Sequence, residues 1–130
     1  MTLCYLDSSA FLKVFKREDE SDAMVNYFTQ NLDRLFTSEL TVTELLGNLM
    51  RLGLPTQLAE RALAGMTLIP IRQEILHQAA DFRGAGLRSL DAIHLASALS
   101  VRGNLAELVT YDHQLAAFSA GQGVSVVAPS

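Results

Sequence analysis

Short apolar runs alternate along the whole chain with longer segments in which apolar residues recur three and four positions apart. The short runs end at acidic residues, glycine or proline, as buried strands do. The longer segments have the period of helices that pack against a core. The pattern predicts strands at 3–6, 34–37, 67–70, 107–110 and 124–127, and helices at 8–16, 21–31, 41–52, 56–65, 74–83, from 89 onward, and up to about 119.

This alternation of strand and helix predicts the fold class. Connections of helical length favour parallel strands, and a parallel sheet needs helices on both of its faces. At 130 residues the chain is long enough to bury one core, and it contains no internal repeat or linker. We therefore expect a single α/β domain over residues 1–130, a three-layer α/β/α sandwich around a mostly parallel sheet.

Composition and charge exclude several classes of protein. The chain is 49% hydrophobic, as a folded domain is, and its net charge of −4 argues against a basic protein that coats nucleic acid. An enzyme that meets nucleic acid through a local patch and metal ions stays open. The sequence has no Gly-rich phosphate loop, no dinucleotide fingerprint and no serine elbow.

The expected compartment is the cytoplasm. A single cysteine, Cys4, excludes an internal disulfide framework and fits a reducing environment. No apolar run approaches the roughly 18 residues that span a bilayer, and the start of the chain has no secretion signal, so we expect no membrane association.

The segment from Arg88 to Ala98 predicts the start of a helix, with Ser89 as the N-cap and Asp91 in the first turn. Taken alone, Asp91 is a favourable charge at a helix N-terminus. Three other acids change this interpretation. Asp7 directly follows the first predicted strand, Asp112 follows the fourth, and Glu44 lies near the start of a helix.

In open α/β sheets, sites form at the carboxyl ends of the strands, so these four acids are expected to converge. Carboxylates brought together repel one another unless a cation neutralises them, and oxygen-only ligands favour Mg²⁺ or Mn²⁺ over zinc. Such a cation equips a protein for phosphoryl chemistry. The residues alone leave the alternative open that these acids are unrelated caps and surface charges.

A family resemblance decides between the two readings. Four motifs occur in one order, and as an ordered set they resemble the four acidic motifs of PIN-domain ribonucleases, specifically VapC-type toxins of bacterial toxin–antitoxin pairs. The resemblance extends from residue 3 to the Val-Ala-Pro near the end. The motifs are Tyr5-Leu6-Asp7-Ser8-Ser9-Ala10, Thr41-Val42-Thr43-Glu44-Leu45, Ser89-Leu90-Asp91-Ala92-Ile93-His94-Leu95-Ala96 and Val109-Thr110-Tyr111-Asp112.

The resemblance implies a PIN-like fold and a Mg²⁺- or Mn²⁺-dependent endoribonuclease that leaves a 5′-phosphate and a 3′-hydroxyl. It implies four catalytic acids, of which three ligate the metal and Glu44 ligates or orients the attacking water. It also implies that two hydroxyl residues help to hold the site and its substrate. The metal ligands are Asp7, Asp91 and Asp112, the last with the weakest match, and the hydroxyl residues are Ser9 and Thr110.

The same resemblance implies partners. It implies a homodimer, an RNA substrate, and a small VapB-like antitoxin that lies across the toxin and obstructs its site. The predicted helices at 8–16 and 41–52 carry more apolar surface than one core-facing stripe needs, which indicates either burial on two sides or a seam for a partner.

Other residues are weighed beside the acids. Arg88 precedes the helix on the side of the expected pocket and is a candidate to bind a substrate phosphate, with Lys13 a weaker one. His94 lies three residues after Asp91, a spacing typical of a local hydrogen bond, and we assign it no catalytic role.

The alternative functions are a catalytically inactive PIN-like binding module and a phosphatase or nuclease acting on DNA. The target RNA and the number of metal ions cannot be inferred from these residues.

Overall fold

The computed structural model describes residues 2–130, and within them it contains one five-stranded sheet with the order β3-β2-β1-β4-β5. Every neighbouring pair of strands is parallel. The strand β1 lies at the centre, and the chain adds β2 and β3 on one side before it crosses to β4 and β5 on the other. The strands are β1 (Leu3–Leu6), β2 (Leu35–Ser38), β3 (Thr67–Ile69), β4 (Leu105–Val109) and β5 (Val126–Val127).

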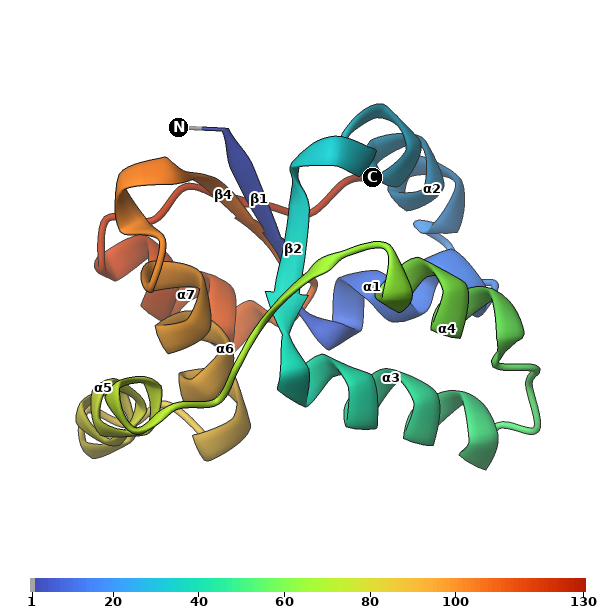
Figure 1. Ribbon diagram of the computed structural model, residues 1–130. Helices are drawn as coiled ribbons and strands as arrows, with labels where there is room; N and C mark the ends of the chain where they lie inside the picture. Colours follow the sequence, from blue (N-terminus) through green and yellow to red (C-terminus); the bar gives the residue numbers. More distant parts are fainter. Residues whose placement is uncertain (1) are drawn as a thin grey trace.

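Helices cover both faces of this sheet (Figure 1), which confirms the three-layer α/β/α prediction. The helices α1 to α4 lie on one side of the strands, and α5 to α7 lie on the other. They are α1 (Ser8–Phe15), α2 (Ser21–Gln30), α3 (Glu39–Arg51), α4 (Gln57–Ala64), α5 (Gln73–Gly84), α6 (Ser89–Leu99) and α7 (His113–Gly121), with short 3₁₀ turns at Leu32–Arg34 and Arg102–Asn104.

Two hydrophobic clusters result from the alternation of side chains along the strands. Tyr5 and Phe36 point into the cluster under α5, α6 and α7, whereas Cys4 and Leu6 point into the cluster under α1 to α4. All four side chains are almost completely buried. The central strand is therefore apolar on both faces, as the continuous run at residues 3–6 predicts.

The predicted elements are all present, with differences at their ends. The helix α3 begins at Glu39, ahead of the predicted start, so Glu44 lies in its second turn. Ser89 is the first residue of α6 and not its N-cap; Arg88 holds the cap position without a side-chain hydrogen bond. No helix within residues 2–130 has the length and apolarity needed to cross a membrane.

The topology sets the place of the site. The connections from β1 and β4 leave the sheet at the same edge and run in opposite directions, which is the switch point where open α/β sheets form ligand sites. Asp7 follows β1, and Thr110 to Asp112 follow β4, so these segments meet although about a hundred residues separate them in the sequence.

Candidate active site

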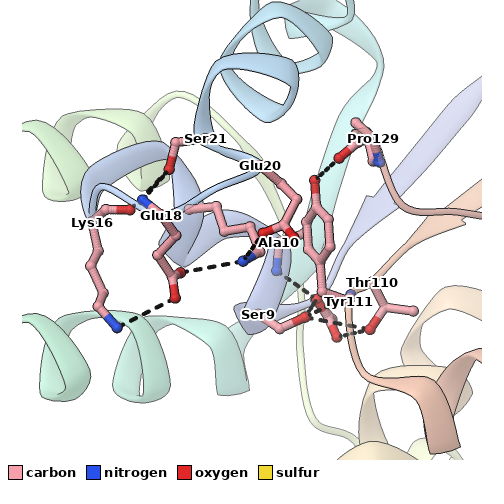
Figure 2. Close-up of polar contacts among 11 residues, drawn as sticks. Ser9, Ala10, Lys16, Glu18, Glu20, Ser21, Thr110, Tyr111 and Pro129 are labelled. Atoms are coloured by element: carbon pink, nitrogen blue, oxygen red, sulfur yellow. Dashed lines mark hydrogen bonds and ion pairs between the residues drawn. The ribbon is translucent and has the colours of Figure 1, made fainter.

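Asp7 joins the central strand to the first helix and is the most enclosed of the four candidate acids. Its side chain caps α1 by accepting a hydrogen bond from the Ala10 backbone N–H at 2.9 Å. It also accepts from Ser9 Oγ at 2.7 Å and from Thr110 Oγ1. Figure 2 shows Ser9 and Thr110 on opposite segments with their hydroxyl groups turned toward each other. Both hydroxyl groups therefore contact the first acid.

Burial raises the pKa of the Asp7 carboxyl above its ordinary value, because desolvation disfavours the charged form. The neighbouring His94 and the hydrogen bonds from Thr110, Ala10 and Ser9 act in the opposite direction and offset only part of this effect. Hydrogen bonds therefore fix the Asp7 carboxylate in place, but too little positive charge lies near it to offset its desolvation.

Ser9 and Thr110 also fix the segment that follows β4. The Tyr111 backbone N–H donates to Ser9 Oγ at 3.0 Å, and the Asp112 backbone N–H donates to Thr110 Oγ1 at 3.0 Å. The two hydroxyl groups thereby connect the loop after β1 to the loop after β4. Asp112 is positioned through Thr110 relative to Asp7.

Arg88 brings the last two acids together. Its Nη2 lies 2.9 Å from Asp91 Oδ2 and 2.6 Å from Asp112 Oδ2, and its Nε donates to the same Asp91 oxygen at 3.0 Å. Asp112 uses its other oxygen to cap α7, accepting from the Leu115 N–H at 2.8 Å. One cation therefore bridges acids that come from the starts of two different helices.

Glu44 reaches the site from α3 and is held by a residue that the sequence analysis set aside. Its Oε1 lies 2.6 Å from Nε2 of His94, and His94 Nδ1 lies 2.7 Å from the Tyr5 hydroxyl. The predicted local hydrogen bond between His94 and Asp91 was wrong, because both ring nitrogens contact distant residues. Glu44, Arg88 and Asp91 line one open pocket of about 290 Å³.

Lys13 lies on the other side of the loop after β4. Its Nζ forms ion pairs with Glu20 at 2.7 Å and Glu18 at 3.5 Å and sits 4.6 Å from the centre of the Tyr111 ring. Figure 2 shows Glu20 beside that ring and the Tyr111 hydroxyl directed at Pro129, to whose carbonyl oxygen it donates at 2.6 Å. The charge of Lys13 is thus largely balanced by its own acidic partners.

The donor chemistry of these acids fits a hard divalent cation, since carboxylate oxygens are its preferred ligands. The position of Arg88 shows that the space between Asp91 and Asp112 accepts a positive charge. Within residues 2–130, however, no three His, Cys, Asp or Glu side chains gather closely enough to hold a metal ion in the arrangement seen here. Glu44 is paired with His94, and Asp7 accepts two hydrogen bonds at Oδ1 and one at Oδ2.

Two kinds of feature in this site were not predicted from the sequence. Asp7 and Asp112 act as site acids and as N-caps at once, since each stands directly before a helix. The hydrogen bonds that His94 forms with Glu44 and Tyr5 were not predicted either. The available signal was that Tyr5 and His94 each stand directly between apolar neighbours in the sequence.

Comparison with known proteins agrees with the resemblance found in the motifs. A family model described as the PIN domain matches residues 4–120. Ribonuclease VapC46 of Mycobacterium tuberculosis is 37% identical over the full length of both chains, and Ribonuclease VapC47 of the same species is 35% identical over 87% of each.

Solved structures agree in fold. A toxin–antitoxin complex from Klebsiella pneumoniae has a chain that matches with a TM-score of 0.73 at 24% identity, covering 98% of both chains. The protein PAE2754 from Pyrobaculum aerophilum matches with a TM-score of 0.63 at 22% identity, over 96% of this chain and 83% of that one. With its parallel sheet, its acids at the switch point and its full-length relatives, the chain belongs to the VapC-type branch of the PIN-domain family.

Proposed function

We propose that this chain is the toxin of a VapBC-type pair and hydrolyses RNA phosphodiester bonds with the help of Mg²⁺ or Mn²⁺. One observation carries the proposal: Asp91 and Asp112, from the starts of two separate helices, are drawn onto one cationic nitrogen next to the buried Asp7 segment. The full-length similarity to proteins named ribonucleases supports the same reaction. The cytoplasm remains the expected compartment.

In this proposal Asp7, Asp91 and Asp112 would hold the metal, which would supply an activated water molecule and positive charge for the phosphate that is cleaved. Glu44, which faces the same pocket as Asp91, orients that water. Ser9 and Thr110 keep the Asp7 carboxylate and the Asp112 backbone in place.

Arg88 is proposed to contact the RNA backbone. Its side chain is 61% exposed at the mouth of the pocket, so its guanidinium can reach a phosphate that approaches from solvent. Planar guanidinium groups pair well with phosphate oxygens, and such contacts position a substrate without reading its sequence. Lys13 is a poorer candidate for this role, because its side chain is only 12% exposed.

We also propose a VapB-like antitoxin as a partner and a homodimer as the resting assembly. The apolar residues of α1 pack into the core between α2 and α3, so burial on two sides explains that helix. The end of α3 and the start of α4 differ, because Met50, Leu52 and Leu58 are exposed there. These three side chains are the proposed contact for a partner segment.

The alternative, an inactive PIN-like binding module, makes a different prediction for one experiment. Purified protein free of partner would be incubated with a mixed RNA pool in Mg²⁺, in Mn²⁺ and in chelator, and new ends would be sequenced. We expect metal-dependent cuts that leave 5′-phosphates and that disappear in Asp7→Asn. Asp33→Asn, an exposed acid before β2, is the matched control and should cleave normally. Cleavage retained by Asp7→Asn would refute the assigned site, and a folded protein that cuts nothing would favour the binding module.

A further inference from the structure

A chain of two hydrogen bonds, one buried and one part-buried, runs from the hydrophobic core to the proposed site. It begins at the Tyr5 hydroxyl on β1, passes through both nitrogens of His94 on α6, and ends at the carboxylate of Glu44 on α3. Tyr5 is fully buried, His94 is 2% exposed, and the Glu44 side chain is 19% exposed. The three residues come from three different elements, so they form a connection that none of those elements requires for itself.

The chemistry of the partners fixes where the hydrogen atoms lie. A carboxylate can only accept, so His94 Nε2 must carry a hydrogen and donate it to Glu44 Oε1. When the imidazole is neutral, Nδ1 is the acceptor and the Tyr5 hydroxyl donates to it. Burial raises the pKa of Tyr5 well above its ordinary value, which keeps that hydroxyl protonated. Tyr5 thereby fixes the ring tautomer that Glu44 needs.

Aromatic packing also holds the ring. Tyr5 stands edge-on to Phe36 at 5.2 Å between ring centres and edge-on to His94 at 5.9 Å. His94 is therefore enclosed by the cluster beneath α6, while its Nε2 is turned outward to the pocket lined by Glu44, Arg88 and Asp91.

We propose that His94, oriented by Tyr5, is a positioning residue that fixes one oxygen of the Glu44 carboxylate and so leaves the other directed at the reacting water. The effect on cleavage rests on the proposed ribonuclease activity. The proton arrangement does not, and it is measured separately in metal-free protein without RNA.

The first test is nitrogen-15 NMR of the histidine side chains in chelator. We expect His94 Nε2 to carry a hydrogen that exchanges slowly with water, and that exchange should quicken in Glu44→Ala. A bare Nε2 in the wild-type protein would overturn the inference, whether or not the protein cleaves RNA. His77 and His113, both exposed, are internal references.

The second test is a double-mutant cycle on RNA cleavage. Loss of a residue that orients a reacting group typically reduces activity by about 10–100-fold, and we expect His94→Leu to lower kcat by this factor with KM little changed. His94→Gln, which keeps a donor, should recover part of the rate, and Tyr5→Phe should give a smaller loss with its packing retained. In a Glu44→Gln background none of the three should slow the reaction further.

The matched control is Ser97→Ala on the same helix. Ser97 is as buried as His94, but its hydroxyl donates only to the Ile93 carbonyl oxygen of its own helix, so kcat should not change. Losses that add to that of Glu44→Gln, or equal losses in Ser97→Ala, would show that His94 serves stability alone. If the wild-type protein does not cleave RNA, the proposed function fails while the NMR result still decides the inference.

Discussion

At the scale of single residues, the site contains side chains that serve the fold and the chemistry at once. Asp7 is the clearest case, because its side chain caps α1 and accepts three hydrogen bonds. Burial nevertheless raises the pKa of its carboxyl group. An acid whose pKa is higher in the folded state stabilises the protein only below its unfolded pKa, about 3.9 for Asp. That contribution is lost as the pH rises through the folded value. At neutral pH the charged Asp7 therefore costs stability.

Asp7→Asn should consequently raise the free energy of unfolding at neutral pH. Asparagine is as good an N-cap as aspartate and removes the buried charge. Denaturant unfolding in chelator should show the variant more stable near pH 7, with the difference shrinking toward pH 4, at about the unfolded pKa of Asp. A variant less stable than wild type by the same amount across that range would contradict the assignment of burial as the dominant influence on Asp7.

Arg88 offers a second prediction at this scale. Its guanidinium neutralises Asp91 and Asp112 in metal-free protein, so Arg88→Ala should lower the Tm in chelator. The same change should tighten Mn²⁺ binding, measured by electron paramagnetic resonance, because the cation no longer competes with Arg88 for the two carboxylates. Arg51→Ala, at the exposed end of α3, is the control and should alter neither quantity. Weaker Mn²⁺ binding in Arg88→Ala would refute this role.

At the scale of elements, helix starts deliver the acids to the site. The side chain of Asp112 caps α7 through the Leu115 N–H, and the side chain of Asp91 lies in the first turn of α6. The N-terminus of a helix favours negative charge, which lessens the repulsion between acids gathered there. Glu44 lacks this help in the second turn of α3 and is held by His94 instead.

Replacing Asp112 separates its two roles. Asp112→Ala removes both the cap of α7 and the ion pair with Arg88, whereas Asp112→Asn loses only the ion pair, so the alanine variant should be less stable than the asparagine variant by about 0.5–2 kcal/mol. Both variants should lose RNA cleavage, because the carboxylate charge is gone. Urea unfolding and the cleavage assay together check this. Equal destabilisation by the two substitutions would show that the cap contributes little.

The sequence predicted most of the fold because the strands and helices differ in period. Residues 3–6 form a continuous apolar run, as a strand buried on both faces requires, and α6 follows its glycine break as expected. The helix ends were less predictable, since Arg88 caps α6 with its backbone alone. The pairing of His94 with Tyr5 and Glu44 could not be predicted, because contacts across three elements depend on tertiary packing that no local spacing encodes.

At the scale of the whole molecule, the central strand β1 links the site to the stability of the fold. Cys4 on this strand is fully buried and is the only cysteine of the chain. Since β1 has a strand on either side and a helical layer on either face, local opening should not expose its thiol.

Thiol labelling should therefore report global unfolding. A disulfide reagent should modify Cys4 very slowly in native protein, because a buried thiol is unreactive. The labelling free energy should fall with urea along the same slope as unfolding followed by circular dichroism. Rapid labelling without denaturant would mean that β1 opens locally. Asp33→Cys, exposed before β2, supplies a fast-reacting control.

The position of β1 at the centre of the sheet also bears on the timing of synthesis. The first acid leaves the ribosome early, but Thr110, which holds it, and Asp112 belong to the last part of the chain. While β4 is still inside the ribosome it cannot pair with β1, so the nascent chain has no complete site. A growing copy of this protein is thus harmless to the RNA that encodes it until the segment around Thr110 and Asp112 has been made and has folded.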